Sequence, residues 1–363
     1  MRAKFTLIAC AACVLSACAA PTPETMTPVI VPSDTPIAIA SPILPTETPS
    51  PTLEPAATPV PWLATILERG NVNCGVDPMR PDYDATRPDF DIDVCRAIAS
   101  ALFNDPDAYD VFPLDLNAAA AALRAGEIDV YIGPNDQALP GIVNGPTLFI
   151  DATGAIARAD VGIRTIADLK FATVCLMQDT IDERLFNEAA TAARVTHQPL
   201  LFNPGDFDAM YSTYDQGHCD AVVDNRIRLW QRLPTLTVPS DHDLIDLVLT
   251  IGSRGPITPS NDVNWSNIVA AIGNSLIRAE ELGVDSAGID AARTQDDTGI
   301  RELLGVEGDI GHRLGLSRNF AAWVVEHVGN LGEIYARHFG ALPRGPNALV
   351  KDGGLIDAPP PSP

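Results

Sequence analysis

Apolar residues recur with two different periods along the chain, and the alternation of these periods predicts an α/β fold. Apolar positions three and four residues apart, typical of helices, cover residues 91–103 and 117–125. Short apolar runs typical of strands lie before, between and after these helices, at 69–76, 109–114 and 129–132. Strands that alternate with helices form βαβ units with mostly parallel strands and right-handed crossovers.

The pattern restarts after residue 150, which predicts a second α/β unit inside the first. Its strands are expected at 171–176, 199–202, 219–223 and 244–251, with helices at 180–193 and 207–216. A long amphipathic helix at 264–282 and a helical tail containing several glycines follow. Two α/β units, the second inserted into the first, form two lobes, and the space between lobes is the usual place for a small ligand.

Capping signals support these helices. Asn117 is expected to be the N-cap of the helix at 117–125, and Gly126 to end that helix. Thr180 and Glu183 have the spacing of a capping box. A helix N-terminus at Thr180 would present free N–H groups to an anion such as a carboxylate.

Asp224 is the first candidate for ligand binding because it ends the apolar run 219–223. In open α/β sheets, ligands lie beyond the carboxyl ends of the strands. A carboxylate at this place can hold a cation, typically a ligand ammonium. Asp is also a favoured N-cap residue, so the alternative is that Asp224 only caps the helix expected over 227–230.

The first 18 residues have the pattern of a targeting segment. Arg2 and Lys4 precede a short apolar stretch that is too short to span a bilayer as a permanent helix. Leu15-Ser-Ala-Cys18 then resembles a bacterial lipobox, which predicts that residues 1–18 are a lipoprotein signal peptide and that Cys18 carries the lipid. The alternative is an ordinary signal peptide cut after a small residue.

Residues 19–61 are rich in Pro and Thr and have no regular apolar period. Such a segment cannot bury a core, and it is expected to be a disordered spacer. The protein is therefore expected to be exported, in the periplasm or on the outer face of the cytoplasmic membrane, and to contact the membrane through its lipid anchor only.

Charge and cysteine content narrow the function classes. A formal net charge of −23 argues against binding to nucleic acid or anionic lipid. Four cysteines remain after the targeting segment, and an even number in an exported chain suggests disulfides: Cys74, Cys95, Cys175 and Cys219. The most local pairing is Cys74 with Cys95 and Cys175 with Cys219. Zinc is the alternative, but no CxxC or CxxH spacing supports it, and no metal or other cofactor is expected.

Several segments together resemble the general L-amino-acid-binding proteins of bacterial ABC uptake systems, within the type II (family 3) extracellular solute-binding proteins. The similarity covers most of residues 66–360. The segments that carry it are Arg69–Val76, Asp91–Ala99, Leu123–Val130, Ala172–Cys175, Gly217–Ala221, Asp224, Leu303–Gly305, Leu314–Leu316, Val328–Ile334, Arg344–Asn347 and Gly353–Leu355.

This resemblance implies a two-lobed Venus flytrap fold with a helical C-terminal extension on the first lobe. Residues 62–153 and 254–363 would form the first lobe and its helical tail, and residues 154–253 the inserted second lobe. Such proteins close on one small solute and deliver it to the transmembrane subunits of an ABC permease. The resemblance favours a monomeric binding protein and not an enzyme.

The resemblance also points to the ligand site, where this sequence departs from the family. In the family, an Arg of the first lobe holds the ligand carboxylate, but Gly141 stands at the aligned position, and Asn135 and Asp136 replace the usual Ser and Thr. In the second lobe, Asp179 replaces a Gly before the retained Thr180. Two further expected ligand contacts are Asp224, for the ligand ammonium, and Tyr83, in a loop where the family has an aromatic residue.

These departures remove one positive charge and add carboxylates, so we expect a more cationic solute, such as a basic amino acid or an amine. Two alternatives remain: a local shift of the alignment, with Arg80, Arg158 or Arg164 supplying the charge, and a related protein that no longer binds. Other functions on this fold are a cyclohexadienyl dehydratase-like enzyme, which needs an acid with a raised pKa, and a ligand sensor without transport.

Overall fold

The structure, a computed structural model, describes residues 61–81 and 89–359 of the chain. The predicted lipid anchor Cys18, the predicted spacer up to residue 60 and Tyr83 lie outside these residues.

The strands are β1 (Val72–Val76), β2 (Tyr109–Pro113), β3 (Val130–Pro134), β4 (Ile142–Asn144), β5 (Phe149–Arg158), β6 (Thr173–Met177), β7 (Gln198–Phe202), β8 (Ala221–Asn225), β9 (His242–Leu244) and β10 (Leu249–Pro259). The helices are α1 (Trp62–Arg69), α2 (Phe90–Phe103), α3 (Leu116–Ala125), α4 (Ile181–Ala192), α5 (Phe207–Asp215), α6 (Arg226–Arg232), α7 (Val263–Glu281), α8 (Ile289–Ala292), α9 (Thr298–Leu303), α10 (Ile310–Leu314), α11 (Phe320–His327) and α12 (Leu331–Phe339).

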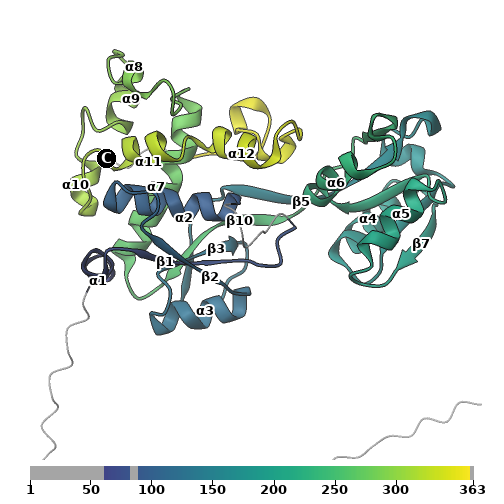
Figure 1. The fold of residues 1–363 in the computed structure, drawn as a ribbon, viewed down its shortest axis with the longest axis horizontal. Helices are drawn as coiled ribbons and strands as arrows, with labels where there is room; N and C mark the ends of the chain where they lie inside the picture. Colours follow the sequence, from purple (N-terminus) through teal and green to yellow (C-terminus); the bar gives the residue numbers. More distant parts are fainter. Residues whose placement is uncertain (1–60, 82–88, 360–363) are drawn as a thin grey trace, which may run out of the picture. The chain divides into compact units, whose positions relative to one another are not determined.

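The first lobe is built on the parallel strands β2, β1 and β3, in that order across the sheet. Its main core joins the apolar faces of α2 and α7 to β1, and includes Val76, Ile98 and Trp265. Helices α11 and α12 of the C-terminal tail lie beside α2 and α7 (Figure 1), and their apolar residues belong to the same core. The tail therefore extends the first lobe, as the family resemblance predicts.

The second lobe has the parallel strands β7, β6 and β8, in that order. Alternate residues of β6 and β8 are buried on opposite faces of the sheet. Val174 and Val223 pack with Phe186 of α4, whereas Val222 packs with Tyr214 of α5. Both faces of β6 and β8 are therefore covered, which explains why these two strands are apolar runs without polar alternation, whereas the edge strand β7 is mostly exposed.

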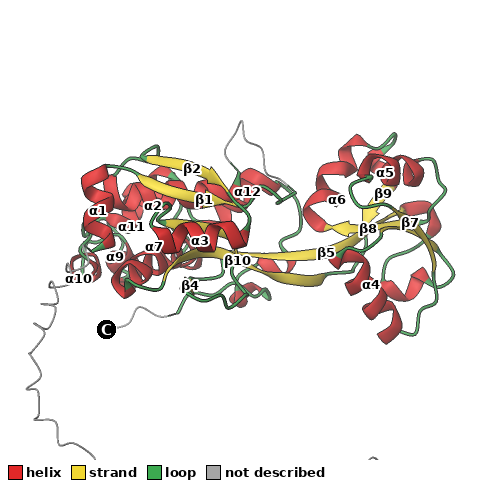
Figure 2. Ribbon diagram, turned by 90° about the horizontal axis from the view of Figure 1, so that it is seen from below, coloured by secondary structure: helices red, strands yellow, loops and turns green. Residues whose placement is uncertain are grey.

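The two long antiparallel strands β5 and β10 belong to both lobes (Figure 2). At one end β10 pairs with β3 of the first lobe, and at the other end β5 pairs with β8 of the second. The predicted lobe boundaries at 153/154 and 253/254 fall inside these strands. The expected strand at 244–251 is wrong, because two strands, β9 and β10, divide this stretch.

The tail is also attached to the strand that connects the lobes. Asn347 forms two hydrogen bonds with the backbone of Ile150 in β5: its Oδ1 accepts from the Ile150 N–H at 2.6 Å, and its Nδ2 donates to the Ile150 carbonyl at 2.8 Å. The guanidinium of Arg344 pairs with Glu280 of α7 and lies over the ring of Tyr335. The segment Arg344–Asn347 thus attaches the tail to β5. It is one of the segments that carry the family resemblance.

Three local expectations require correction. The N-cap of α3 is Asp115, whose Oδ1 accepts from the N–H groups of Asn117 and Ala118, and not Asn117. The capping box at Thr180 is half formed, because the Glu183 carboxylate accepts from the backbone of Asp179 at 2.7 Å, one residue before the cap. The sequence pattern also missed α1, which docks through hydrogen bonds from Trp62 to distant aspartates.

Both disulfides expected as the most local pairing are present, Cys74–Cys95 and Cys175–Cys219. The first joins β1 to α2, and the second joins β6 to the residue two before β8. Each lobe thus has one covalent link inside its own sheet-helix unit, and none of the four sulfur atoms is available to a metal.

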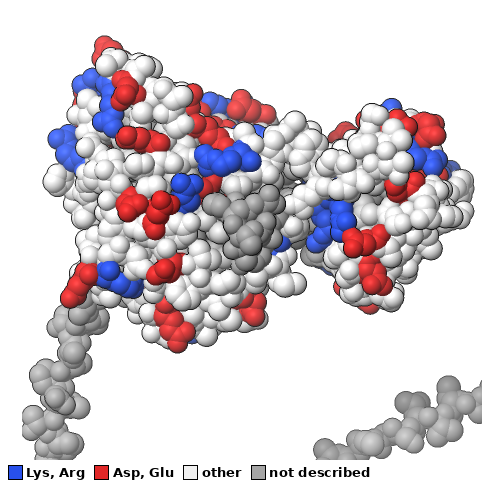
Figure 3. Space-filling view, in the orientation of Figure 1, with Lys and Arg blue, Asp and Glu red and all other residues white. Residues whose placement is uncertain are grey.

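The acidic excess is not gathered into one patch on the face that Figure 3 shows, where Asp and Glu alternate with Lys and Arg. Among the described residues, none of the helices has the length and apolar character needed to cross a membrane.

Removal of a disulfide should lower the free energy of unfolding by more when the disulfide closes a longer loop, and the increase is logarithmic in loop length. The Cys175–Cys219 link spans 44 residues and the Cys74–Cys95 link spans 21. Loop entropy then predicts that Cys175→Ala with Cys219→Ala lowers the free energy of unfolding by about 4 kcal/mol, and the other pair of substitutions by about 3 kcal/mol. Urea unfolding under non-reducing conditions measures both. Unchanged midpoints would contradict this account.

Asn347→Ala should destabilise the protein more than an ordinary polar substitution. It leaves the N–H and carbonyl of the buried Ile150 without partners, which costs about 3 kcal/mol in the free energy of unfolding. Asn144→Ala is the matched control, because the exposed Asn144 makes one side-chain hydrogen bond, to the carbonyl of Gln137, and should change stability by less than about 0.5 kcal/mol. Equal effects of the two substitutions would exclude the proposed attachment of β5.

Candidate functional site

Asp224 lies near the carboxyl end of β8, where the parallel strands of the second lobe end, and its side chain is 2% exposed. It does not cap the following helix. The side chain of Asn225 does so instead, accepting from the N–H of Ile227 at 2.9 Å. The structural alternative considered for Asp224 from the sequence is therefore wrong.

Three donors converge on the Asp224 carboxylate. The Tyr211 hydroxyl donates at 3.0 Å, the Asn225 N–H at 2.7 Å and Nη1 of Arg228 at 2.5 Å. Burial raises the pKa of Asp224 above its usual value, although Arg228, Asn225 and Tyr211 act in the opposite direction. Burial beside Asp224 also raises the pKa of Tyr211, so its hydroxyl stays protonated and donates.

Thr180 and Asp179 lie where the chain passes from β6 into α4. The Thr180 hydroxyl accepts from the Glu183 N–H at 3.2 Å and donates to the Met177 carbonyl at 2.9 Å, so it is engaged as the N-cap. Asp179 has a φ of +59°, a left-handed conformation that glycine adopts at lower cost. A carboxylate therefore stands at a backbone position that favours glycine.

Asp182, in the first turn of α4, is a site residue that the sequence interpretation missed. Its Oδ1 accepts from the Thr153 hydroxyl of β5 at 2.5 Å. The pKa of Asp182 is raised to about 6: burial is the main cause, the neighbouring carboxylates of Asp224 and Asp151 act in the same direction, and the Thr153 hydrogen bond and Arg228 oppose them. Its position two residues after Thr180 was the available sequence signal.

Asp151 and Asp136 extend this group of carboxylates toward the first lobe. Asp151 of β5 accepts from Nδ2 of Asn225 at 2.6 Å, and it stands opposite Gly252 of β10. A side chain at Gly252 would meet Asp136, whose Oδ2 is 2.4 Å from the place of its Cβ. Because opposite residues of paired strands have Cβ atoms about 5 Å apart on one face, Asp136 and Asp151 are neighbours. We call Asp136, Asp151, Asp182 and Asp224 the acidic strip.

Asn135 does not join the acidic strip. Its side chain is buried, and Nδ2 donates to the carbonyls of Gly145 at 3.2 Å and Pro146 at 3.3 Å. Gly141 lies further along the same loop, with a φ of +83°, and a side chain there would collide with Arg124 at the C-terminal end of α3. The position aligned with the family's Arg is therefore packed against α3.

The three arginines considered as substitutes for that Arg are engaged elsewhere. Arg80 is buried, pairs with Asp91 at 2.5 Å and lies over the rings of Phe90, Phe149 and Phe339. Arg158 and Arg164 belong to the second lobe, where they pair with Asp160 and Asp243. Arg228, four residues after Asp224, is a cation that the structure places in direct contact with the acidic strip.

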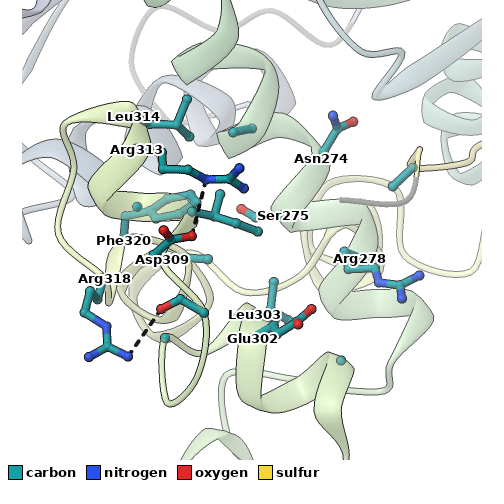
Figure 4. A pocket seen from close by; sticks show the side chains of 18 of the residues that line it. Asn274, Ser275, Arg278, Glu302, Leu303, Asp309, Arg313, Leu314, Arg318 and Phe320 are labelled. Atoms are coloured by element: carbon teal, nitrogen blue, oxygen red, sulfur yellow. Dashed lines mark hydrogen bonds and ion pairs between the residues drawn. The ribbon is translucent and has the colours of Figure 1, made fainter. Parts of the chain in front are cut away.

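The described residues also form two hollows. A shallow depression along α4 includes Asp179 and Thr180. A cavity of about 520 Å³ lies in the C-terminal extension, between α7 and the segment 299–321, with Asn274, Arg278 and Phe320 in its wall (Figure 4). None of the residues predicted to bind a ligand lines this second cavity, so it is separate from the predicted site.

Comparisons with known proteins agree with the architecture. No protein-family model matches the chain. The general L-amino-acid-binding periplasmic protein AapJ of Rhizobium johnstonii is 31% identical over 316 residues, which cover 82% of this chain and 92% of that protein. The glutamate/glutamine/aspartate/asparagine-binding protein BztA of Rhodobacter capsulatus is 30% identical over 315 residues, with the same coverage of 82% and 92%.

A solved structure gives the same result. The ABC transporter periplasmic binding protein from Brucella ovis, with glutathione bound, is 28% identical and superposes with a TM-score of 0.64 over 82% of this chain and 98% of that one. AapJ and the Brucella protein are named as periplasmic binding proteins, which implies that this chain also works outside the cytoplasm. The chain belongs to the family 3 extracellular solute-binding proteins, in the general L-amino-acid-binding subfamily that serves bacterial ABC transporters.

Proposed function

We propose that this protein is the lipid-anchored substrate-binding component of an amino-acid-type ABC importer and that its solute is a basic amino acid or a related amine. The solute would bind at the edge where β5 and β10 pass between the lobes and would be handed to the transmembrane subunits of the permease. The predicted anchor, Cys18, would hold the protein at the outer face of the cytoplasmic membrane as a monomer.

The observation that carries the choice of ligand is the acidic strip. Four carboxylates from β5, β8, α4 and the loop after β3 lie along one edge, with Arg228 beside Asp224 and with Arg254, which is already paired with Asp77 and Asp91, within electrostatic reach of Asp151. A ligand with one carboxylate and one ammonium would leave this negative charge largely uncompensated. A second positive charge on the ligand would compensate it, because opposite charges within a few ångströms attract strongly in a partly desolvated site.

The relatives' ligands support an amino-acid-like solute but differ from the one proposed. AapJ is named for general L-amino acids and BztA for acidic amino acids and their amides. The Brucella protein holds glutathione, a larger molecule with a net negative charge. Loss of the first-lobe Arg at Gly141 and gain of Asp136 and Asp179 argue that the present protein selects the opposite charge.

A thermal-shift screen of the full chain tests the ligand class. L-lysine and L-norleucine form a matched pair, because they differ mainly in the terminal ammonium of the side chain. Lysine or arginine at a hundredfold excess over Kd should stabilise the protein by about 2.7 kcal/mol, which a rise in melting temperature reports. Norleucine, glutamine and glutathione should give no comparable shift. Tight binding of norleucine or glutamine without binding of lysine would exclude a cationic solute.

Binding of a cation should depend on pH through Asp182. Its raised pKa, about 6, means that the folded protein binds more protons than the unfolded chain between about pH 4 and pH 6, so the unliganded protein loses stability as the pH rises through this interval. A cation favours the ionised carboxylate. The affinity for lysine should therefore increase about tenfold between about pH 5 and about pH 7, with release of a proton on binding.

Calorimetry in buffers with different ionisation enthalpies measures this proton release. Asp182→Asn keeps the hydrogen bond from Thr153 and removes the titrating group, so it should flatten the pH dependence. Asp160→Asn is the matched control, because that carboxylate is exposed and pairs with Arg158 away from the acidic strip. An unchanged pH dependence in Asp182→Asn would show that another group controls it.

A further inference from the structure

Arg228 occupies the place that the family resemblance assigns to the ligand ammonium. Its Nη1 donates to Oδ1 of Asp224 at 2.5 Å, and Tyr211 and Asn225 supply the other two donors. A carboxylate accepts about four hydrogen bonds, and the Asp224 side chain is 2% exposed. While Arg228 stays in place, a ligand ammonium therefore has little access to Asp224.

The guanidinium of Arg228 is held in a fixed orientation and remains accessible. Its central carbon lies 3.8 Å from the centroid of the Phe207 ring, and its side chain is 21% exposed. Stacking on the ring and the ion pair with Asp224 fix the plane of the guanidinium, and one of its nitrogens serves Asp224. Arginine has five N–H donors in a planar fork suited to carboxylates, so donors remain for a ligand.

We propose that Arg228 receives the ligand carboxylate and that Asp224 is a positioning residue, which acts by holding Arg228. This inference rests on the proposed function, because it assigns one subsite within the same ligand site. The second lobe then supplies the arginine that the first lobe lacks at Gly141.

The first-lobe side of the site fits the same arrangement. Asp136 lies over Gly252, beside Asp151, so carboxylates stand where the strands leave the first lobe. Gly141 carries no side chain and lies next to Arg124. The ligand would thus place its carboxylate on the second lobe and its ammonium groups toward Asp136 and Asp151, opposite to the orientation that the family resemblance implies.

A competing role for Arg228 is that of an internal plug, displaced from Asp224 when a ligand cation binds. The two roles predict opposite effects of removing it. If Arg228 binds the ligand carboxylate, removal of its guanidinium weakens the binding only of ligands that have a carboxylate. If Arg228 is a plug, it lowers the affinity of the wild-type protein for every cationic ligand, and its removal raises the affinity for all of them.

L-lysine and cadaverine, which is lysine without the carboxylate, separate these roles when their Kd values are measured by calorimetry on the full chain. We expect the wild-type protein to prefer lysine. Arg228→Gln should weaken lysine binding about 10- to 100-fold and leave cadaverine binding unchanged or stronger. Arg228→Lys, which keeps a positive charge beside Asp224 but loses the planar fork, should weaken lysine binding with little effect on cadaverine.

Arg164→Gln is the matched control. This arginine also belongs to the second lobe, pairs with the exposed Asp243 away from the acidic strip and should leave both affinities unchanged. Equal strengthening of lysine and cadaverine in Arg228→Gln, or wild-type affinities that are equal for both, would overturn the assignment and leave the proposed function intact. Failure of the wild-type protein to bind any amino acid or amine would overturn both.

Discussion

The architecture depends on one constraint, which is that β5 and β10 are each continuous through both lobes. Their backbone hydrogen bonds join the sheet of the first lobe to that of the second, so the two lobes meet at a paired ribbon and not at a flexible linker. The register of this pair also sets the chemistry. It brings Asp151 opposite Gly252, where the absence of a side chain leaves room for the Asp136 carboxylate. The acidic strip is therefore a product of strand pairing.

Charge compensation decides which of these carboxylates can meet a ligand. Asp224 is the most buried of the four and is satisfied from within the protein, by a tyrosine, a backbone N–H and Arg228. Burial and the neighbouring carboxylates of Asp224 and Asp151 raise the pKa of Asp182 to about 6, although its single hydroxyl donor, Thr153, acts in the opposite direction. Unpaired negative charge in a partly buried place is costly, and it is the usual source of selectivity for a cation because binding relieves that cost.

Much of the fold was predictable because local signals and burial agreed. The strands β6 and β8 have apolar sequences because both of their faces are covered, and the disulfide pairs were the most local choices. β5 and β10 were harder to predict, because Gly154 and Gly252 interrupt their apolar pattern. Each glycine is required by another side chain, Arg226 in one case and Asp136 in the other. The signal of a strand was thus lost at positions where packing requires a glycine.

The site was predictable only where a residue type and its position in a single element were sufficient. Asp224 and Thr180 end or begin elements, so their places at the sheet edge followed from the pattern. Arg228 could have been noticed as an i, i+4 partner of Asp224, but this spacing is common on exposed helices, where it contributes little. What distinguishes Arg228 is the burial of Asp224 and the ring of Phe207, which lies 21 positions earlier in the chain on another helix. Tertiary contacts therefore turn an ordinary helical pair into an oriented guanidinium at the ligand site.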